Sequence, residues 1–184
     1  TQGGSTLTQQ LVKNMFLTRE RTSTRKINEM LMALMLEYHY SKEDILSAYV
    51  NETYLGQNGK RRIHGFGMAA EFYFSKPLNE LNNAEVALLV GMVKGASYYN
   101  PRKQTKRALN RRNLVLKLLK NKEFISEVEF EVAISKPLNI TDKPKWSRAK
   151  CPAYIDLVRR HLKRDYRITE IRDEGLVIHT AVEN

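Results

Sequence analysis

Cysteine is almost absent from this sequence, since Cys151 is the only one in 184 residues. A single cysteine excludes an internal disulfide bond and a cysteine-rich metal site. The four histidines show no ligand spacing such as HExxH, so a histidine metal site is not expected. No apolar run reaches the roughly 20 residues that a membrane-spanning helix needs. The hydrophobic fraction of 42% is ordinary for a globular protein, and the length predicts one domain with a tail.

Acidic side chains are outnumbered, because 31 lysines and arginines stand against 20 aspartates and glutamates, and the net charge is +11. A charge this far from zero indicates an anionic partner. The candidates are nucleic acid, an anionic lipid surface and a phosphorylated substrate, and charge alone does not choose among them. The chain also opens on TQGGST without a methionine. We therefore expect targeting and anchoring segments upstream of Thr1.

Apolar spacing and capping signals predict a predominantly helical chain. Two capping boxes are expected, one at Ser41 with Asp44 and one at Ser126 with Glu129, and Asn83 is expected to cap a further helix. The predicted elements are helices at 6–17, 24–40, 42–56, 68–74, 84–94, 105–120, 127–136 and 152–164, a basic loop at 57–65, a linker at 136–151 and a strand at 175–182.

The first predicted helix has a polar face beside its apolar one. Thr6, Gln10 and Lys13 share this face, and Asn14 lies at its border. Free backbone N–H groups at the helix start, together with Lys13, form a reasonable anion site. The alternative is a capped surface helix whose polar face is solvated, and spacing alone favours that simpler interpretation.

The second predicted helix is apolar nearly all round beyond Glu29, which predicts that it is buried. Arg25 lies one turn before Glu29. The carboxylate of Glu29 is therefore either structurally paired with Arg25 or a working group in a cationic setting, and the sequence leaves both interpretations open. One face carries Ile27, Met30, Leu31, Leu34, Met35 and Tyr38, and the opposite face carries Arg25, Glu29, Met32 and Leu36.

Five motif segments follow one another along the chain: Gly4–Asn14 (GSTLTQQLVKN), Arg25–Glu29 (RKINE), Lys42–Asn51 (KEDILSAYVN), Gly65–Phe74 (GFGMAAEFYF) and Gly91–Ala96 (GMVKGA). In this order and spacing they resemble motifs of the family 51 peptidoglycan glycosyltransferases. The stretch from Gly91 to Pro101 and the Arg-rich helix that follows it look most like the bifunctional class A penicillin-binding proteins of the 1B type. The resemblance to the family covers about residues 3 to 140. Five ordered motifs are a far more specific signal than any one of them.

The resemblance implies an all-α, lysozyme-like glycosyltransferase domain over residues 1–140. At 141–184 it implies a linker and a short β segment that begins a transpeptidase domain. Members of the family polymerise lipid II with inversion at the anomeric carbon and release undecaprenyl diphosphate. Such chemistry needs a base for the attacking hydroxyl and compensation for charge on the leaving group.

The resemblance also implies roles for individual residues. Glu29 is expected to be catalytic on the leaving-group side, and the family leaves open a divalent cation, Mg²⁺ or Mn²⁺, with Glu29 as a ligand. No E-D-x-x-F-x-x-H-x-G motif is present, so the catalytic base is expected upstream of Thr1 and the isolated chain is expected to be inactive. Residues expected to bind substrate or diphosphate are Ser5, Thr6, Gln10, Lys13, Asn14, Arg25, Lys26, Lys94 and Ser97.

The expected partners are lipid II, the growing glycan strand and an anionic membrane surface at the periplasmic face of a bacterial inner membrane. A transpeptidase domain is expected downstream in the intact protein, and the anchor upstream. Met15, Phe16 and Leu17 either dip into the bilayer surface or belong to the core, and the sequence weights these equally.

Two other function classes remain as alternatives. The first is a nucleic-acid-binding module built on the basic helix at 105–120. Its leucines interleave with the basic residues, so its inner side is expected to be core and no nucleic acid is expected as a partner. The second is a lytic transglycosylase or muramidase, which shares the lysozyme-like fold and also uses a glutamate, but which cleaves glycan instead of extending it.

Overall fold

A computed structural model describes residues 5–16, 22–59 and 61–141 of the chain. The chain divides into two compact units, residues 1–145 and 146–184, and every described residue belongs to the first. Most of the predicted linker, the predicted helix at 152–164 and the predicted strand at 175–182 lie outside the described residues.

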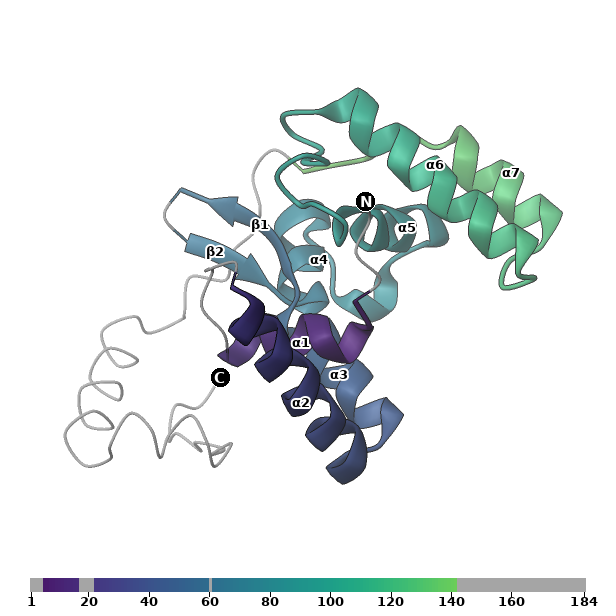
Figure 1. Ribbon diagram of the computed structural model, residues 1–184. Coiled ribbons are helices and arrows are strands. Elements are labelled where there is room, and N and C mark those ends of the chain that lie inside the picture. The colour runs from purple at the N-terminus through teal and green to yellow at the C-terminus, as the bar shows by residue number, and fades with distance from the viewer. Residues whose placement is uncertain (1–4, 17–21, 60, 142–184) are drawn as a thin grey trace, which may run out of the picture. The chain divides into compact units, whose positions relative to one another are not determined.

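Helices dominate the described unit, so the predicted all-α class is confirmed (Figure 1). A single hairpin of two short strands interrupts them within the described residues. The elements are α1 Leu7–Phe16, α2 Ser23–His39, α3 Lys42–Glu52, β1 Tyr54–Asn58, β2 Arg61–His64, α4 Phe66–Phe74, the 3₁₀ helix η1 Leu78–Glu80, α5 Asn83–Met92, α6 Thr105–Asn121 and α7 Glu127–Ser135.

Side-chain caps explain where several helices begin. The hydroxyl of Ser41 accepts a hydrogen bond from the Asp44 backbone at the start of α3, and the reciprocal bond from the Ser41 backbone to Asp44 is also present. The predicted box at the start of α7 is likewise confirmed. At α5 the cap is Asn82, one residue before the predicted position, because its side chain accepts from the backbone of Ala84 and Glu85.

The predicted loop at 57–65 is in part a β-hairpin. Strand β1 pairs antiparallel with β2, with Gln57 opposite Arg62. Leu55 and Ile63 are fully buried on its inner side, and α3 accordingly ends at Glu52 instead of at Gly56. Glycine and arginine in this segment predicted a loop, but burying two large apolar side chains requires their backbone groups to pair.

Helix α5 lies at the centre of the unit, with Leu88, Leu89 and Met92 almost fully buried. One core cluster joins α5 to α6 and α7. A second, smaller cluster lies between α1 and α3 and consists of Leu11, Ile45 and Tyr49, against which Ala48 and Val93 pack. We call this second group the α1–α3 cluster.

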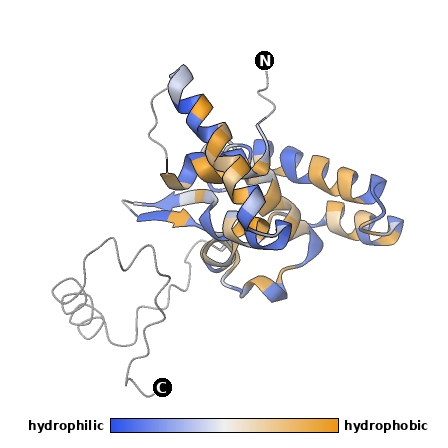
Figure 2. Cartoon of the chain, turned by 60° about the horizontal axis from the view of Figure 1, so that its bottom comes forward, coloured by the Kyte–Doolittle hydropathy of each residue, from blue (hydrophilic) through white to orange (hydrophobic). Residues whose placement is uncertain are grey.

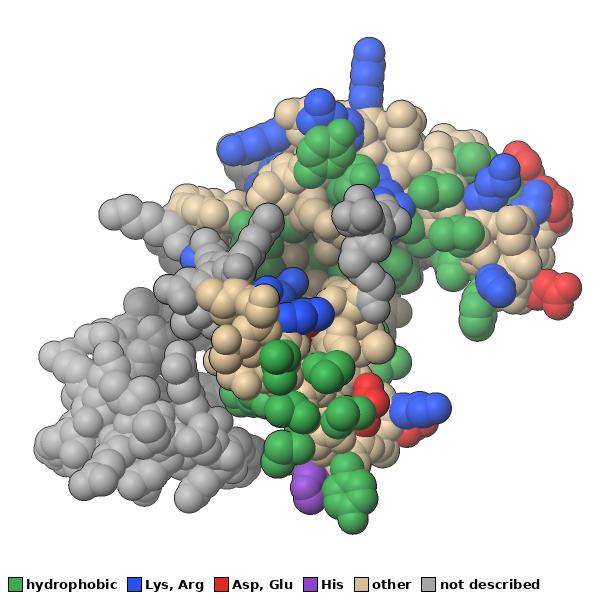
Figure 3. All heavy atoms as spheres, viewed as in Figure 1, with side chains coloured by type: hydrophobic (Ala, Val, Ile, Leu, Met, Phe, Trp, Pro, Cys, Tyr) green, Lys and Arg blue, Asp and Glu red, His purple; other side chains and the backbone are tan. Residues whose placement is uncertain are grey.

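Helix α2 is not buried as predicted. Among its residues only Glu29 and Ala33 are buried, and the face that rests on α1 and α3 carries Arg25, Glu29, Met32 and Leu36. The opposite face forms a green patch over α2 in Figure 3, and the orange bands along this helix in Figure 2 mark its apolar residues on both faces. Of the residues that the structure describes, none covers this apolar stripe, which consists of Ile27, Met30, Leu31, Leu34, Met35 and Tyr38, each 47–85% exposed.

Candidate functional site

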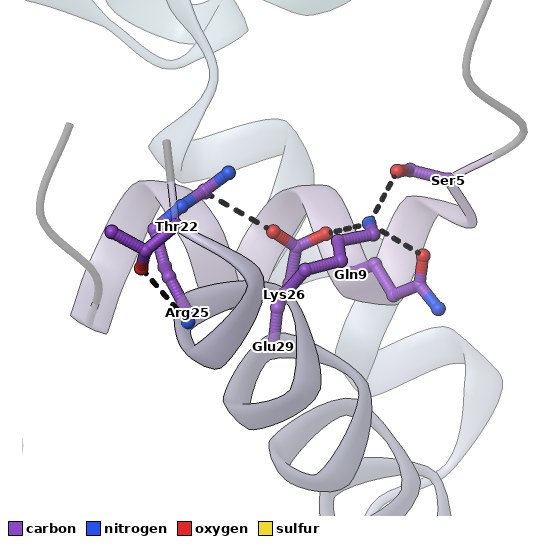
Figure 4. Close-up of polar contacts among 6 residues, drawn as sticks. All are labelled: Ser5, Gln9, Thr22, Arg25, Lys26 and Glu29. Carbon is purple, nitrogen blue, oxygen red and sulfur yellow. Dashed lines mark hydrogen bonds and ion pairs between the residues drawn. The ribbon is translucent and has the colours of Figure 1, made fainter. Parts of the chain in front are cut away.

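The start of α1 is tied to the first turns of α2 by the ammonium group of Lys26 (Figure 4). Its Nζ donates to the Ser5 hydroxyl at 2.8 Å and to the side-chain oxygen of Gln9 at 3.4 Å. The third donor pairs with the carboxylate of Glu29. An ammonium group has three donors, so all of them are used within the chain. Lys26 therefore fixes the N-terminal turn of α1 against α2.

Glu29 is the buried acidic group of this site, with only 2% of its side chain exposed. One carboxylate oxygen pairs with Lys26, and the other lies 3.3 Å from Nη1 of Arg25. A buried charge must be paired to be tolerated, and here both carboxylate oxygens are. The pairing of Arg25 with Glu29, one of the two interpretations that the sequence leaves open, is present, and Lys26 adds a second cation. We call Arg25, Lys26 and Glu29 the charged cluster.

The positions of these three residues follow from how α2 begins. The Thr22 side chain caps the helix by accepting from the backbone of Arg25 at 3.1 Å. Arg25 and Lys26 then lie in the first turn, and the i+4 and i+3 spacings bring Glu29 onto the same side. Cations at a helix N-terminus oppose the helix dipole, whose positive end is there. The charged cluster consequently has a net positive charge at a place that favours an anion.

The guanidinium of Arg25 has a hydrogen-bond donor that a ligand could use. Its Nε is buried and, within the described part of the chain, it has no hydrogen-bond partner. Its Nη1 is engaged with Glu29, and 18% of the side chain is exposed. An unsatisfied buried donor costs free energy, about 1–3 kcal/mol. An incoming anion that reaches this guanidinium would relieve part of that cost.

Gln9 and Gln10 are neighbours in sequence but face different helices. Gln9 accepts from Lys26 of α2, whereas the side-chain oxygen of Gln10 accepts from the hydroxyl of Tyr49 in α3 at 3.2 Å. Neither Gln9 nor Tyr49 was among the predicted site residues, although they lie in the motif segments Gly4–Asn14 and Lys42–Asn51. Their place in these motifs is the signal that could have found them, but it does not show which residues they contact.

The remaining predicted residues do not bond to the charged cluster. Thr6 caps α1 by accepting from the backbone of Gln9 at 3.2 Å. Lys13 and Asn14 are exposed on α1, and Ser97 is exposed beyond α5. The structure therefore links Ser5, Arg25, Lys26 and Glu29 by hydrogen bonds and ion pairs, and among the described residues it shows no such link from the other predicted residues to the charged cluster.

Lys94 occupies a turn that directly follows α5. The preceding residue, Val93, packs against the α1–α3 cluster, so this turn lies beside α1 and α3 although it is distant from them in sequence. Lys94 itself is exposed. None of the hydrogen bonds or ion pairs among the described residues involves its ammonium group. A lysine at this position could instead cap the carbonyl groups at the end of α5, but no hydrogen bond among the described residues supports that structural role.

The donor set around Glu29 does not fit a resident divalent cation. Both carboxylate oxygens are already paired with cations. No group of three or more His, Cys, Asp or Glu side chains that could hold a metal occurs among the described residues. The divalent cation stays a prediction of the family resemblance, and no chemical step is derived through it.

The basic helix α6 directs several of its cations inward or onto aromatic rings. Arg112 is 1% exposed and donates to backbone carbonyls at the end of α7, and burial lowers the pKa of its guanidinium. Arg107 stacks over Tyr98 at 4.5 Å from the ring centroid. Lys120 pairs with a glutamate of α7 at 2.7 Å. These cations stabilise the helical packing, which leaves a smaller free basic face than the sequence suggests.

Among the described residues no helix has the length and apolar character needed to cross a membrane.

Comparison with known proteins gives matches along nearly the whole chain. The sequence model of the family described as Transglycosylase matches residues 1–120. Penicillin-binding protein 1B of Vibrio cholerae is 48% identical over 182 residues, covering 99% of this chain and 23% of that protein. The proteins of the same name from Haemophilus influenzae and Escherichia coli are 51% and 49% identical, covering 89% and 88% of this chain and 21% and 19% of theirs. The chain thus spans about a fifth of the length of these relatives.

Proposed function

Because this chain belongs to the transglycosylase family, we propose that it is the glycan-polymerising part of a peptidoglycan glycosyltransferase. The predicted resemblance to the family 51 enzymes is confirmed by the family match and by the relatives of the 1B type. In the proposed reaction, an acceptor sugar hydroxyl attacks the anomeric carbon of a lipid-diphosphate-linked glycan with inversion, and the base expected upstream of Thr1 takes the hydroxyl proton. The bond to the diphosphate breaks, and undecaprenyl diphosphate leaves.

The observation that carries this proposal is the charged cluster, in which Arg25 Nε has no hydrogen-bond partner among the described residues. A leaving diphosphate gains negative charge as its bond breaks, and preorganised cations lower the free energy of that transition state. Arg25 supplies the guanidinium, and Glu29 holds it in place. A lytic enzyme that cleaves finished glycan has no diphosphate to stabilise, so the cluster favours polymerisation over cleavage.

The two cations of the cluster differ in how many of their hydrogen-bond donors are already used within the described part of the chain, and this difference separates their roles. All three donors of Lys26 are used by Ser5, Gln9 and Glu29, so we assign Lys26 to holding α1 against α2. Arg25 has a donor, Nε, without a partner in the described part of the chain, and it is assigned to the diphosphate. Ser5 lies beside the ammonium of Lys26 at the start of α1, where free backbone N–H groups also attract phosphate oxygens.

Incubation of the intact protein with lipid II tests the function directly. We expect polymeric glycan and undecaprenyl diphosphate as products, detected by gel electrophoresis and by mass spectrometry. The same protein incubated with finished peptidoglycan is the control. Release of soluble muropeptides from finished peptidoglycan, without polymer from lipid II, would instead identify a lytic enzyme.

A nucleic-acid-binding function is not favoured. The cations of α6 that would contact phosphates are in part buried or stacked on Tyr98 and Tyr99. Preferential, salt-dependent binding of DNA over lipid II would overturn this view.

We also propose that the protein works at the periplasmic face of a bacterial inner membrane, with a transpeptidase domain in the same intact polypeptide. Met15 and Phe16 at the end of α1 are 47% and 56% exposed, which supports contact with a lipid surface. Leu17, the third residue of the predicted membrane contact, lies outside the described residues. Anionic lipid would also attract the basic excess of the chain.

Replacing Met15, Phe16 and Leu17 together with Ser is expected to weaken binding to anionic liposomes about tenfold or more, because each apolar side chain buried in lipid stabilises binding. Sedimentation with liposomes measures this affinity. A matched control replaces Leu114, Leu118 and Val132 with Ser, since these residues of α6 and α7 are 46–53% exposed. Unaltered liposome binding by the first variant would argue against the membrane contact.

A further inference from the structure

We infer that Tyr49 is a positioning residue that orients the side-chain amide of Gln10 for the diphosphate of the substrate. This inference rests on the proposed function. Tyr49 belongs to α3 and is 9% exposed, and its hydroxyl donates to Oε1 of Gln10 in α1 at 3.2 Å.

The hydrogen bond holds the Gln10 side chain with its amide oxygen toward Tyr49. An amide group carries an acceptor oxygen and a donor NH₂ on opposite sides, and the two can exchange places by a flip of the side chain. With the oxygen bound to Tyr49, the NH₂ group is directed away from α3. Among the described residues nothing accepts from this NH₂ group. It is therefore free to donate to a phosphate oxygen, whereas the flipped amide would present an oxygen and repel it.

The ring of Tyr49 has a second role that can be separated from that of its hydroxyl. It packs with Leu11 and Ile45 in the α1–α3 cluster, and Val93 packs against the same cluster. Val93 directly precedes Lys94. The cluster to which Tyr49 belongs thus supports two groups that are far apart in sequence, the amide of Gln10 and the turn that carries the Lys94 ammonium. Neither group has an acceptor among the described residues, and two such donors suit an anion and not a cation.

Replacing Tyr49 with Phe removes the hydroxyl and keeps the ring. In the intact protein we expect the KM for lipid II to rise about threefold to tenfold, which is the effect of losing one ordinary hydrogen bond. The kcat should change much less, because Tyr49 does not touch the reacting atoms. Inorganic pyrophosphate, added as a competitive inhibitor, should show a Ki raised by the same factor.

A double-mutant cycle with Gln10→Met separates positioning from a structural role. In the Gln10→Met protein, the further change Tyr49→Phe should leave KM unaltered, since there is no amide left to orient. Tyr73→Phe is the matched control. Its hydroxyl donates to the Leu55 carbonyl at 3.0 Å, and burial raises the pKa of Tyr73 to about 12, so it remains a donor at assay pH. This control should lower the melting temperature without raising KM.

Four results would overturn the inference. An unchanged KM for Tyr49→Phe, in a wild-type protein that polymerises lipid II, would reject Tyr49 and leave the proposed function in place. A full rise in KM in the Gln10→Met background would show that Tyr49 acts by another route. A raised KM with an unchanged pyrophosphate Ki would move the amide from the diphosphate to the sugar. Failure of the wild-type protein to polymerise lipid II would reject the proposed function, and this inference with it.

Discussion

Replacing Glu29 with Gln in the intact protein is expected to lower glycan polymerisation by at least about a hundredfold, with the fold retained. Glutamine keeps the size of the side chain and one acceptor for Lys26, but it removes the negative charge. The cations of Arg25 and Lys26 then face each other at the positive end of α2 without compensation. We therefore expect Arg25 to leave the orientation in which it meets the diphosphate.

Polymerisation of lipid II and circular dichroism together check this prediction. Glu85→Gln provides a matched control, because Glu85 is 3% exposed and pairs with Lys76 at 2.7 Å. Glu85 belongs to the capping box of α5 and is not part of the charged cluster. Glu85→Gln should therefore lower the free energy of unfolding about as much as Glu29→Gln does, and it should keep wild-type turnover. Normal turnover by Glu29→Gln would show that Glu29 has no part in the mechanism. Its role would then be structural, as the ion-pair partner of Arg25 and Lys26.

Replacing Lys94 with Ala is expected to weaken binding of a diphosphate-containing inhibitor about tenfold to a hundredfold, the effect of losing one charge-assisted hydrogen bond. The position of the turn against the α1–α3 cluster supports this role, as does the absence of a partner for the ammonium among the described residues. Because the side chain is exposed, its removal should leave the melting temperature nearly unchanged. Isothermal titration calorimetry with the inhibitor measures the affinity.

Lys122→Ala is the appropriate control for Lys94. Lys122 is also an exposed lysine at the end of a helix, where it caps α6, and its loss changes the net charge equally. The control therefore reports the general effect of one fewer positive charge on an anionic ligand. Equal affinity of the wild-type protein and Lys94→Ala would return Lys94 to the structural role of a lysine at a helix C-terminus.

Helix starts were predictable because their signals are local. The cap Ser41 and its partner Asp44 are three residues apart, and both bonds of the box depend only on the backbone of that turn. The cap of α5 was misplaced by one residue because Asn82 and Asn83 are equally good caps in sequence. The ion pair of Arg25 with Glu29 was also foreseeable, since i+4 residues share a helix face.

The burial of α2 was predicted wrongly for a physical reason. Both of its faces are apolar beyond Glu29. The spacing of apolar residues shows that a helix has an apolar face, but it does not show whether another helix packs against that face. The neighbours α1 and α3 contact the face of Glu29 and Met32, which leaves the apolar stripe exposed in the described part of the chain. Packing against α1 and α3 therefore determines which of the two apolar faces of α2 is covered.

The sequence by itself determined the helical class, the family resemblance, the caps of α3 and α7, and the position of Arg25 one turn before Glu29 on α2. All of these depend on residues within about one helical turn of each other or on motifs read in order. Only the tertiary structure decided that Lys26 binds Ser5, 21 residues away, and that Tyr49 binds Gln10, 39 residues away. Such contacts form when α1 packs on α2 and α3, and no local spacing contains the geometry of that packing.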